Sequence, residues 1–171
     1  MMAAMGAVDE LTFEELVETL AAFEQENEPS DVDRAIHRGA VERRLMAILS
    51  AGNRDAERRE FVRVPGELTA RIYRNDEAVI ARVRDLGEGG VRLTSAWAPA
   101  QGSVIEIELI LKSKPAMLHP PRAQGQVAWV RPFGEEYELG LAFHAHDDGH
   151  RRRMRRVVVE LLRRLPPPGL H

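Results

Sequence analysis

Residues 85–90 read Asp-Leu-Gly-Glu-Gly-Gly, and Gly90-Val91-Arg92-Leu93 continues the same stretch. The glycines at 87, 89 and 90 interrupt two runs in which apolar and polar side chains alternate, which is typical of a turn between two strands. Gly89 and Gly90 are expected to take positive φ and to let the backbone come close to a ligand. This stretch therefore predicts a turn between two strands and a candidate ligand-binding site.

Alternating apolar residues continue on both sides of that turn. Six short segments are expected to be strands, and turn residues or a Lys- and Pro-rich loop separate several of them: 68–73, 79–84, 91–93, 105–111, 124–130 and 138–143. Six short strands with turns between them indicate a small antiparallel barrel or sandwich. A final helix is expected from about 147 to 165, where three prolines stop it. Trp129 and Phe143 are expected in the barrel core, although Trp129, near the barrel mouth, could also contact a base.

The first 53 residues follow a different period. Thr12 and Glu15 have the spacing of a capping box, and Ser30 is placed to cap a second helix after Pro29. Two apolar stripes at helical spacing follow, one at Phe13, Leu16, Val17, Leu20 and Ala21 or Phe23, the other at Ile36, Val41, Leu45, Ile48 and Leu49. We predict a helical hairpin over 1–53, a barrel with its C-terminal helix over 54–165, and a disordered tail over 166–171.

Composition excludes several classes of protein. The chain has 171 residues, 44% hydrophobic and 30% charged, and no cysteine, which excludes disulfide scaffolds, thiol catalysis and cysteine-ligated metal clusters. It contains no apolar run of the about 18 residues that a membrane span needs, and no pattern of a signal peptide. We therefore expect a cytoplasmic protein without membrane insertion.

Charge is distributed unevenly along the chain. Residues 1–53 carry 11 acidic and 4 basic side chains, whereas residues 54–171 carry 16 acidic and 20 basic ones. The modest basic excess of the second part suits a small anionic ligand better than a nucleic-acid duplex. Arg59 and Arg63, with Arg58 beside them, can present guanidinium groups to phosphate or to a base. Asp85 can accept hydrogen bonds from the Watson–Crick edge of guanine. Together these residues predict a site for a guanine nucleotide.

Arg59-x-x-x-Arg63 followed by Asp85-x-Gly87-x-x-Gly90 resembles the two motifs of the PilZ domain, a bacterial receptor for cyclic di-GMP. The resemblance covers roughly residues 56–165 and includes Val127-Ala128-Trp129 and Gly140-Leu141-Ala142-Phe143. It implies a six-stranded antiparallel PilZ-like β-barrel, mainly β with helical additions.

The resemblance also implies roles for the motif residues. Arg59 and Arg63 would clamp phosphate and contact guanine, Arg58 would assist, and Asp85 would bind the other guanine edge. Gly90 would allow close approach. Gly87 replaces the serine of the family motif, which removes one hydrogen bond worth about 0.5–1.5 kcal/mol. Regulation of motility or surface polysaccharide is the family-level expectation.

Other readings of the same residues stay open. With Gly87 in the motif, the chain could be a degenerate PilZ protein that binds no nucleotide and acts as a protein–protein interaction module. The basic run at 151–156 is more typical of a solvated helix face than of a nucleic-acid site. His144, His146 and His150 with Asp147 and Asp148 are better explained by a strand end and a helix cap than by metal. No arrangement typical of an enzyme is present.

The hairpin's function is a separate hypothesis. Nucleotide binding by the arginine segment, which lies between the hairpin and the barrel in the sequence, would change the conformation or the partner binding of the protein. The partner would be an unidentified effector protein or a second copy that associates through the hairpin.

Overall fold

The computed structural model describes residues 8–25, 32–49, 62–74, 77–110, 122–144 and 148–166. The chain forms two compact units. One comprises Met1–Val64 and Arg155–His171, and the other comprises Pro65–Met154. The predicted tail at 166–171 lies outside the described residues except for Pro166.

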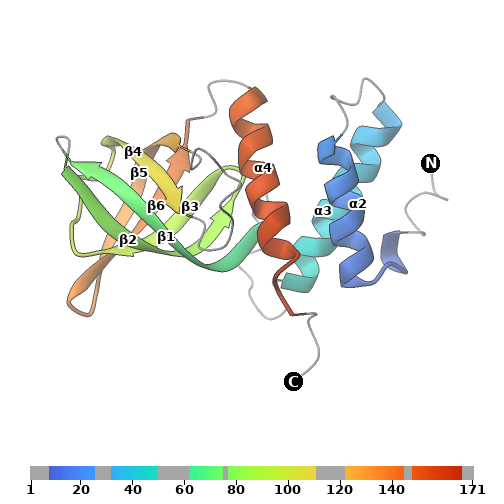
Figure 1. The fold of residues 1–171 in the computed structure, drawn as a ribbon, viewed down its shortest axis with the longest axis horizontal. Coiled ribbons are helices and arrows are strands. Elements are labelled where there is room, and N and C mark those ends of the chain that lie inside the picture. Colours follow the sequence, from blue (N-terminus) through green and yellow to red (C-terminus); the bar gives the residue numbers. More distant parts are fainter. Residues whose placement is uncertain are drawn as a thin grey trace. The chain divides into compact units, whose positions relative to one another are not determined.

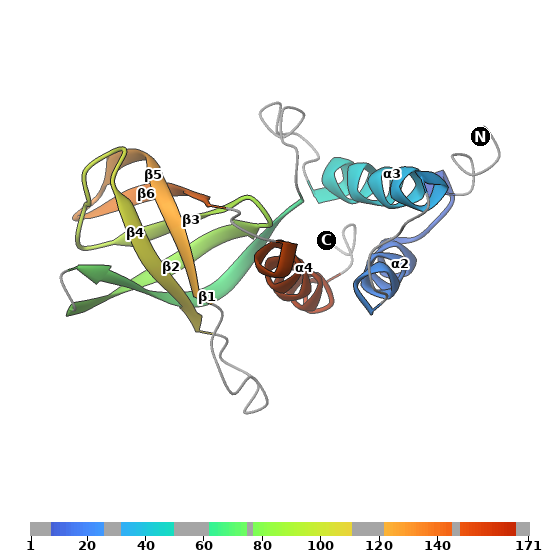
Figure 2. The same ribbon diagram turned by 90° about the horizontal axis from the view of Figure 1, so that it is seen from above.

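The second unit is built on a closed barrel of six strands, as the sequence predicts. The strands are β1 (Arg63–Arg74), β2 (Glu77–Gly87), β3 (Gly90–Ser95), β4 (Val104–Ile110), β5 (Arg122–Phe133) and β6 (Glu136–Phe143). Their order around the barrel is β1-β2-β3-β6-β5-β4, and Figures 1 and 2 show the sheet curving round to close. Because β3 pairs with β6 and β1 with β4, closure joins strands that are distant in sequence.

Alternate residues of these strands fill the barrel. Ile72, Leu93, Ile107, Leu109 and Leu139 are completely buried. Each leucine or isoleucine removed from water in this way contributes about 1.5–3 kcal/mol. The intervening side chains point to the outer face, where polar groups can form hydrogen bonds and ion pairs with neighbouring strands.

The first unit contains α2 (Phe13–Gln25) and α3 (Val32–Leu49), which lie side by side in Figures 1 and 2. The predicted capping box is confirmed: the Thr12 backbone N–H donates to Glu15 Oε2 at 2.8 Å, and the Glu15 N–H donates to Thr12 Oγ1 at 3.3 Å. The ring of Phe23 packs against that of His37 at 5.8 Å between centroids. The predicted cap at Ser30 lies outside the described residues.

The two helices bury unequal faces. The predicted α2 stripe is confirmed, since Leu16, Val17, Leu20 and Ala21 are all buried. On α3 only Val41 and Leu45 are buried; the expected contribution of Ile36 is wrong, because 40% of that residue is exposed. Helical spacing places Ile36 on the apolar stripe of α3. Spacing alone does not show which part of that stripe another helix covers.

The helix α4 (Asp148–Leu162) belongs to both units, dividing between Met154 and Arg155. In the first unit, Arg163 just beyond its end donates two hydrogen bonds to the Glu18 carboxylate of α2, at 2.8 and 2.7 Å. In the second unit, the ring of His150 meets Phe143 edge-on at 5.7 Å. Phe143 is buried, as predicted.

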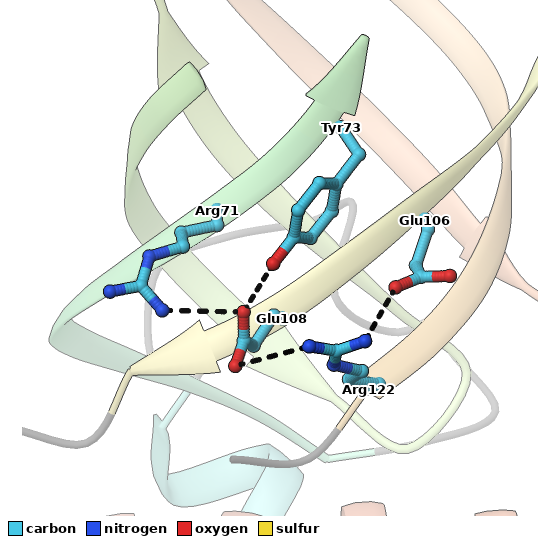
Figure 3. Close-up of polar contacts among 5 residues, drawn as sticks. All are labelled: Arg71, Tyr73, Glu106, Glu108 and Arg122. Atoms are coloured by element: carbon cyan, nitrogen blue, oxygen red, sulfur yellow. Dashed lines mark hydrogen bonds and ion pairs between the residues drawn. The ribbon is translucent and has the colours of Figure 1, made fainter. Parts of the chain in front are cut away.

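A polar cluster crosses the outer face of β1, β4 and β5 (Figure 3). Its centre is Glu108, which is only 4% exposed and accepts hydrogen bonds from Tyr73 at 2.6 Å and from Arg71 at 3.4 Å. Arg122 donates to Glu106 at 3.4 Å and lies 4.0 Å from Glu108. The Tyr73 hydrogen bond lowers the pKa of the Glu108 carboxyl and raises that of the Tyr73 hydroxyl.

Candidate functional site

The β2–β3 hairpin holds three of the predicted site residues in one register. Gly87 pairs with Gly90, Leu86 with Val91, and Asp85 with Arg92. Leu86 and Val91 are completely buried, so the next pair along the hairpin points to the outer face of the barrel. A register shift between Val83 and Asp85 interrupts β2 at this point. Such bulges often lie beside functional sites, where they redirect a side chain.

The Asp85 carboxylate contacts a guanidinium group. Arg92 Nε lies 2.6 Å from Asp85 Oδ2, and Arg92 Nη1 lies 3.7 Å from Glu138 Oε1 on β6. Both carboxylates are largely covered, with side chains 9% and 3% exposed, whereas the arginine is 39% exposed. Glu138 also accepts a hydrogen bond from Arg131 Nε at 2.7 Å. The outer face therefore carries a chain of alternating charges running from β2 to β5.

Trp129 lies beside this chain of charges. It pairs with Gly140, and a side chain at Gly140 would occupy the position of the indole ring. The Arg131 guanidinium lies 5.3 Å from the ring centroid. The expectation of Trp129 in the barrel core is wrong, because a register shift between Val127 and Trp129 puts the indole on the outer face.

Gly90 has a structural role in the barrel, besides the role at a ligand site that the motif resemblance implies. Within the described part of the chain, the glycines with positive φ are Gly102 and Gly134, so the expectation of positive φ at Gly89 and Gly90 is wrong. A Cβ at Gly90 would overlap the backbone carbonyl of Leu141 on β6. The absence of a side chain at Gly90 therefore allows β3 and β6 to approach each other closely.

The remaining predicted residues are placed as follows. Arg63 is half-buried and is the first residue of β1. It belongs to the first unit, whose N-terminal part ends at Val64. Arg58 and Arg59 lie outside the described residues. In the described ranges, no three His, Asp or Glu side chains form a group that could hold a metal ion. His146 and Asp147 are not among those residues.

Arg92 was not among the residues predicted for the site. A signal for it exists in the sequence. If Glu88-Gly89 forms a two-residue loop closed by Gly87 and Gly90, counting outward pairs Asp85 with Arg92, as the structure has them. Glu138 gives no such signal, since its place beside Arg92 depends on the pairing of β3 with β6.

Residues 57–160 match the PilZ domain family. The chain belongs to the PilZ family. Its predicted motifs and its closed barrel are therefore those of a family member, with Gly87 at the position of the motif serine. No curated protein is similar enough in sequence to count as a match.

Solved structures share the PilZ fold at low sequence identity. The PilZ domain of YcgR from Escherichia coli with c-di-GMP is 16% identical, with a TM-score of 0.50 over 62% of this chain and 92% of that one. A longer YcgR in complex with c-di-GMP is 17% identical, with a TM-score of 0.51 over 62% of this chain and 46% of that one. At these identities the likeness supports the fold. None of the described helices is long and apolar enough to cross a membrane.

Proposed function

We propose that this protein is a receptor for cyclic di-GMP and works by binding rather than by catalysis. The observation that carries the proposal is the Asp85 carboxylate, held on the outer face of the barrel by a hairpin whose Gly87 and Gly90 occupy motif positions of the family. The cyclic di-GMP in the two YcgR structures supports the choice of ligand.

Each motif residue has a defined part in this proposal. Arg59 and Arg63 bind phosphate and guanine through their guanidinium groups, and Arg58 adds positive charge. Asp85 accepts hydrogen bonds from a guanine edge. Gly87 supplies a backbone N–H but no hydroxyl, so the affinity is expected to be several-fold to about tenfold lower than a serine would give.

Calorimetry with cyclic di-GMP tests the proposal. Asp85→Asn keeps the shape of the side chain but replaces a charged acceptor with a neutral one. The affinity should fall by about tenfold, because a hydrogen bond to a charged group is worth about 1.5–3 kcal/mol and a neutral one about 0.5–1.5 kcal/mol. Arg63→Ala should act in the same direction. Glu106→Gln is the matched control, because it removes one carboxylate from the outer face of β4, in the Tyr73–Glu108 cluster. Equal affinity in Asp85→Asn and Glu106→Gln would contradict the proposed site.

A protein–protein interaction module without nucleotide is the second candidate. Two observations favour it: Gly87 lacks the motif hydroxyl, and Asp85 already contacts Arg92. Background heat up to about 1 mM cyclic di-GMP, which corresponds to a binding free energy weaker than about −4 kcal/mol, would put this candidate first.

The proposed output is a change in conformation or in partner binding. The arginine segment joins the acidic hairpin to the barrel in the sequence, so a ligand bound by this segment would favour particular orientations of the hairpin. X-ray scattering with and without saturating ligand tests this, and superimposable profiles would overturn it.

Self-association through the hairpin is tested separately. Val32 and Ile36 on α3 are exposed, at 73% and 40%. If the protein associates through this helix, Val32→Glu with Ile36→Glu should return a dimer mass to that of a monomer in light scattering. An unchanged mass would direct the search to an effector protein.

A further inference from the structure

Arg92 is well placed to contact whatever Asp85 binds. It lies on β3 directly across from Asp85, with Nε 2.6 Å from the Oδ2 atom of that carboxylate. Its second contact, to Glu138 at 3.7 Å, comes from the opposite neighbouring strand. The guanidinium group is thus held between two covered carboxylates while 39% of the side chain remains exposed.

The contacts of Arg92 leave hydrogen-bonding capacity unused. Its buried Nε has no hydrogen-bond acceptor among the described residues, although Asp85 Oδ2 lies within 2.6 Å, so the N–H is not aimed at that oxygen. An arginine carries five N–H donors in a planar fork, and an ion pair without directed hydrogen bonds leaves them for another acceptor. Because Nε is buried, a ligand beside Asp85 would accept from the Nη donors of this guanidinium group, which make no hydrogen bond to the described residues.

Guanine has this pattern of groups. Its Watson–Crick edge presents the O6 acceptor next to the N1–H and N2–H donors, and its O6 and N7 acceptors are those that arginine recognises in nucleic acids. Asp85 can accept from the two N–H groups, while the neighbouring guanidinium donates to O6. Adenine presents an amino donor where guanine has O6, so it would place a donor against the Arg92 donors.

Resting on the proposed function, we propose that Arg92 is a specificity-determining residue of the Asp85 site, which selects guanine over adenine by donating to O6. It acts together with Asp85: Asp85 accepts hydrogen bonds from the N–H groups of guanine, and Arg92 donates to O6. The ion pair between Asp85 on β2 and Arg92 on β3 would therefore select the base, a role beyond stabilising the barrel.

Calorimetry on the full chain with three cyclic dinucleotides tests the proposal. Cyclic di-GMP and cyclic di-IMP both carry O6, whereas cyclic di-AMP carries an amino group there. Arg92→Gln should lose about tenfold to a hundredfold in affinity for the first two ligands and little for cyclic di-AMP. Arg92→Lys should lose less, because it keeps the charge but not the planar fork. Arg82→Gln is the control for lost charge, since Arg82 lies on the outer face of β2 and pairs with Glu136.

The outcomes separate this inference from the proposed function. If the native chain binds cyclic di-GMP and Arg92→Gln retains both its affinity and its preference over cyclic di-AMP, Arg92 is a structural ion-pair partner and the inference is overturned. Tighter binding by Arg92→Gln would show that Arg92 competes with the ligand for Asp85, which also overturns it. No binding by the native chain would overturn the proposed function and this inference with it. A melting temperature for each variant shows whether a loss of affinity reflects unfolding, and Arg92→Lys then decides.

Discussion

Tyr73 on β1 donates its hydroxyl hydrogen to Glu108 on β4 over 2.6 Å, and the two residues are 35 positions apart in the chain. The acceptor is a nearly buried carboxylate that also contacts arginines on two strands. Burial disfavours an ionised carboxylate, and here the hydrogen bonds and positive charges outweigh that cost, so the pKa of Glu108 is lowered. The pair joins the first strand of the barrel to the fourth.

Tyr73→Phe should make the barrel less stable at neutral pH. A group with a lowered folded pKa stabilises the fold above its unfolded pKa of about 4.3, and this contribution is lost as the pH falls through the folded pKa. The difference in melting temperature between the native chain and Tyr73→Phe should therefore be largest near pH 7 and shrink below about pH 4. Tyr137→Phe is the control, since Tyr137 is exposed and its hydroxyl makes no hydrogen bond to described residues. A difference independent of pH would contradict the role given to Glu108.

Glu24 should give the opposite pH dependence in the helical unit. Burial raises the pKa of this carboxyl, although Arg155 lies at 3.1 Å and Arg38 at 3.9 Å; the nearby Glu42 raises it further. A raised folded pKa stabilises the fold below the unfolded pKa of about 4.3 and loses this effect as the pH rises through the folded value. The melting temperature of the native chain relative to Glu24→Gln, followed by far-UV circular dichroism, should therefore fall between pH 4 and 7. A rise over that range would mean that attraction to the arginines dominates.

Gly90→Ala should weaken the barrel by about 1–3 kcal/mol or prevent folding, because the new methyl group would overlap the Leu141 carbonyl. That atom belongs to the backbone of a paired strand and cannot move aside by a side-chain rotation. Gly125→Ala is a milder counterpart, since its Cβ would lie 3.2 Å from the Ala142 carbonyl oxygen. Urea unfolding of both variants compares them. Equal free energies of unfolding would show that the overlap at Gly90 costs no more than the milder contact at Gly125, which would contradict the role given to Gly90.

Gly87→Ser should raise the affinity for cyclic di-GMP several-fold to about tenfold, because it restores a hydroxyl worth about 0.5–1.5 kcal/mol. Gly87→Ala isolates the hydroxyl, since it adds the Cβ alone. Calorimetry on the three proteins provides the comparison. Equal affinities of the serine and alanine variants would show that the missing hydroxyl has no part in binding.

Most of the fold could be predicted because its signals are local. The capping box of Thr12 and Glu15 depends on residues three apart, and the alternation in each strand on nearest neighbours. The candidate site was predicted in part, through a motif resemblance that named Asp85, Gly87 and Gly90. The motif resemblance did not name Arg92, although counting outward from the Glu88-Gly89 loop of the hairpin pairs this residue with Asp85.

By itself the sequence determined the six strands, the helical N-terminus and the motif positions, since periodicity and turn chemistry act over a few residues. Only the tertiary structure decided that Glu138 lies beside Arg92, that Glu24 of α2 meets Arg155 of α4, and that Trp129 lies outside the barrel. These relationships depend on barrel closure, helix packing and a single register shift. A strand displaced by one residue turns every side chain to the other face, and no local pattern records that displacement.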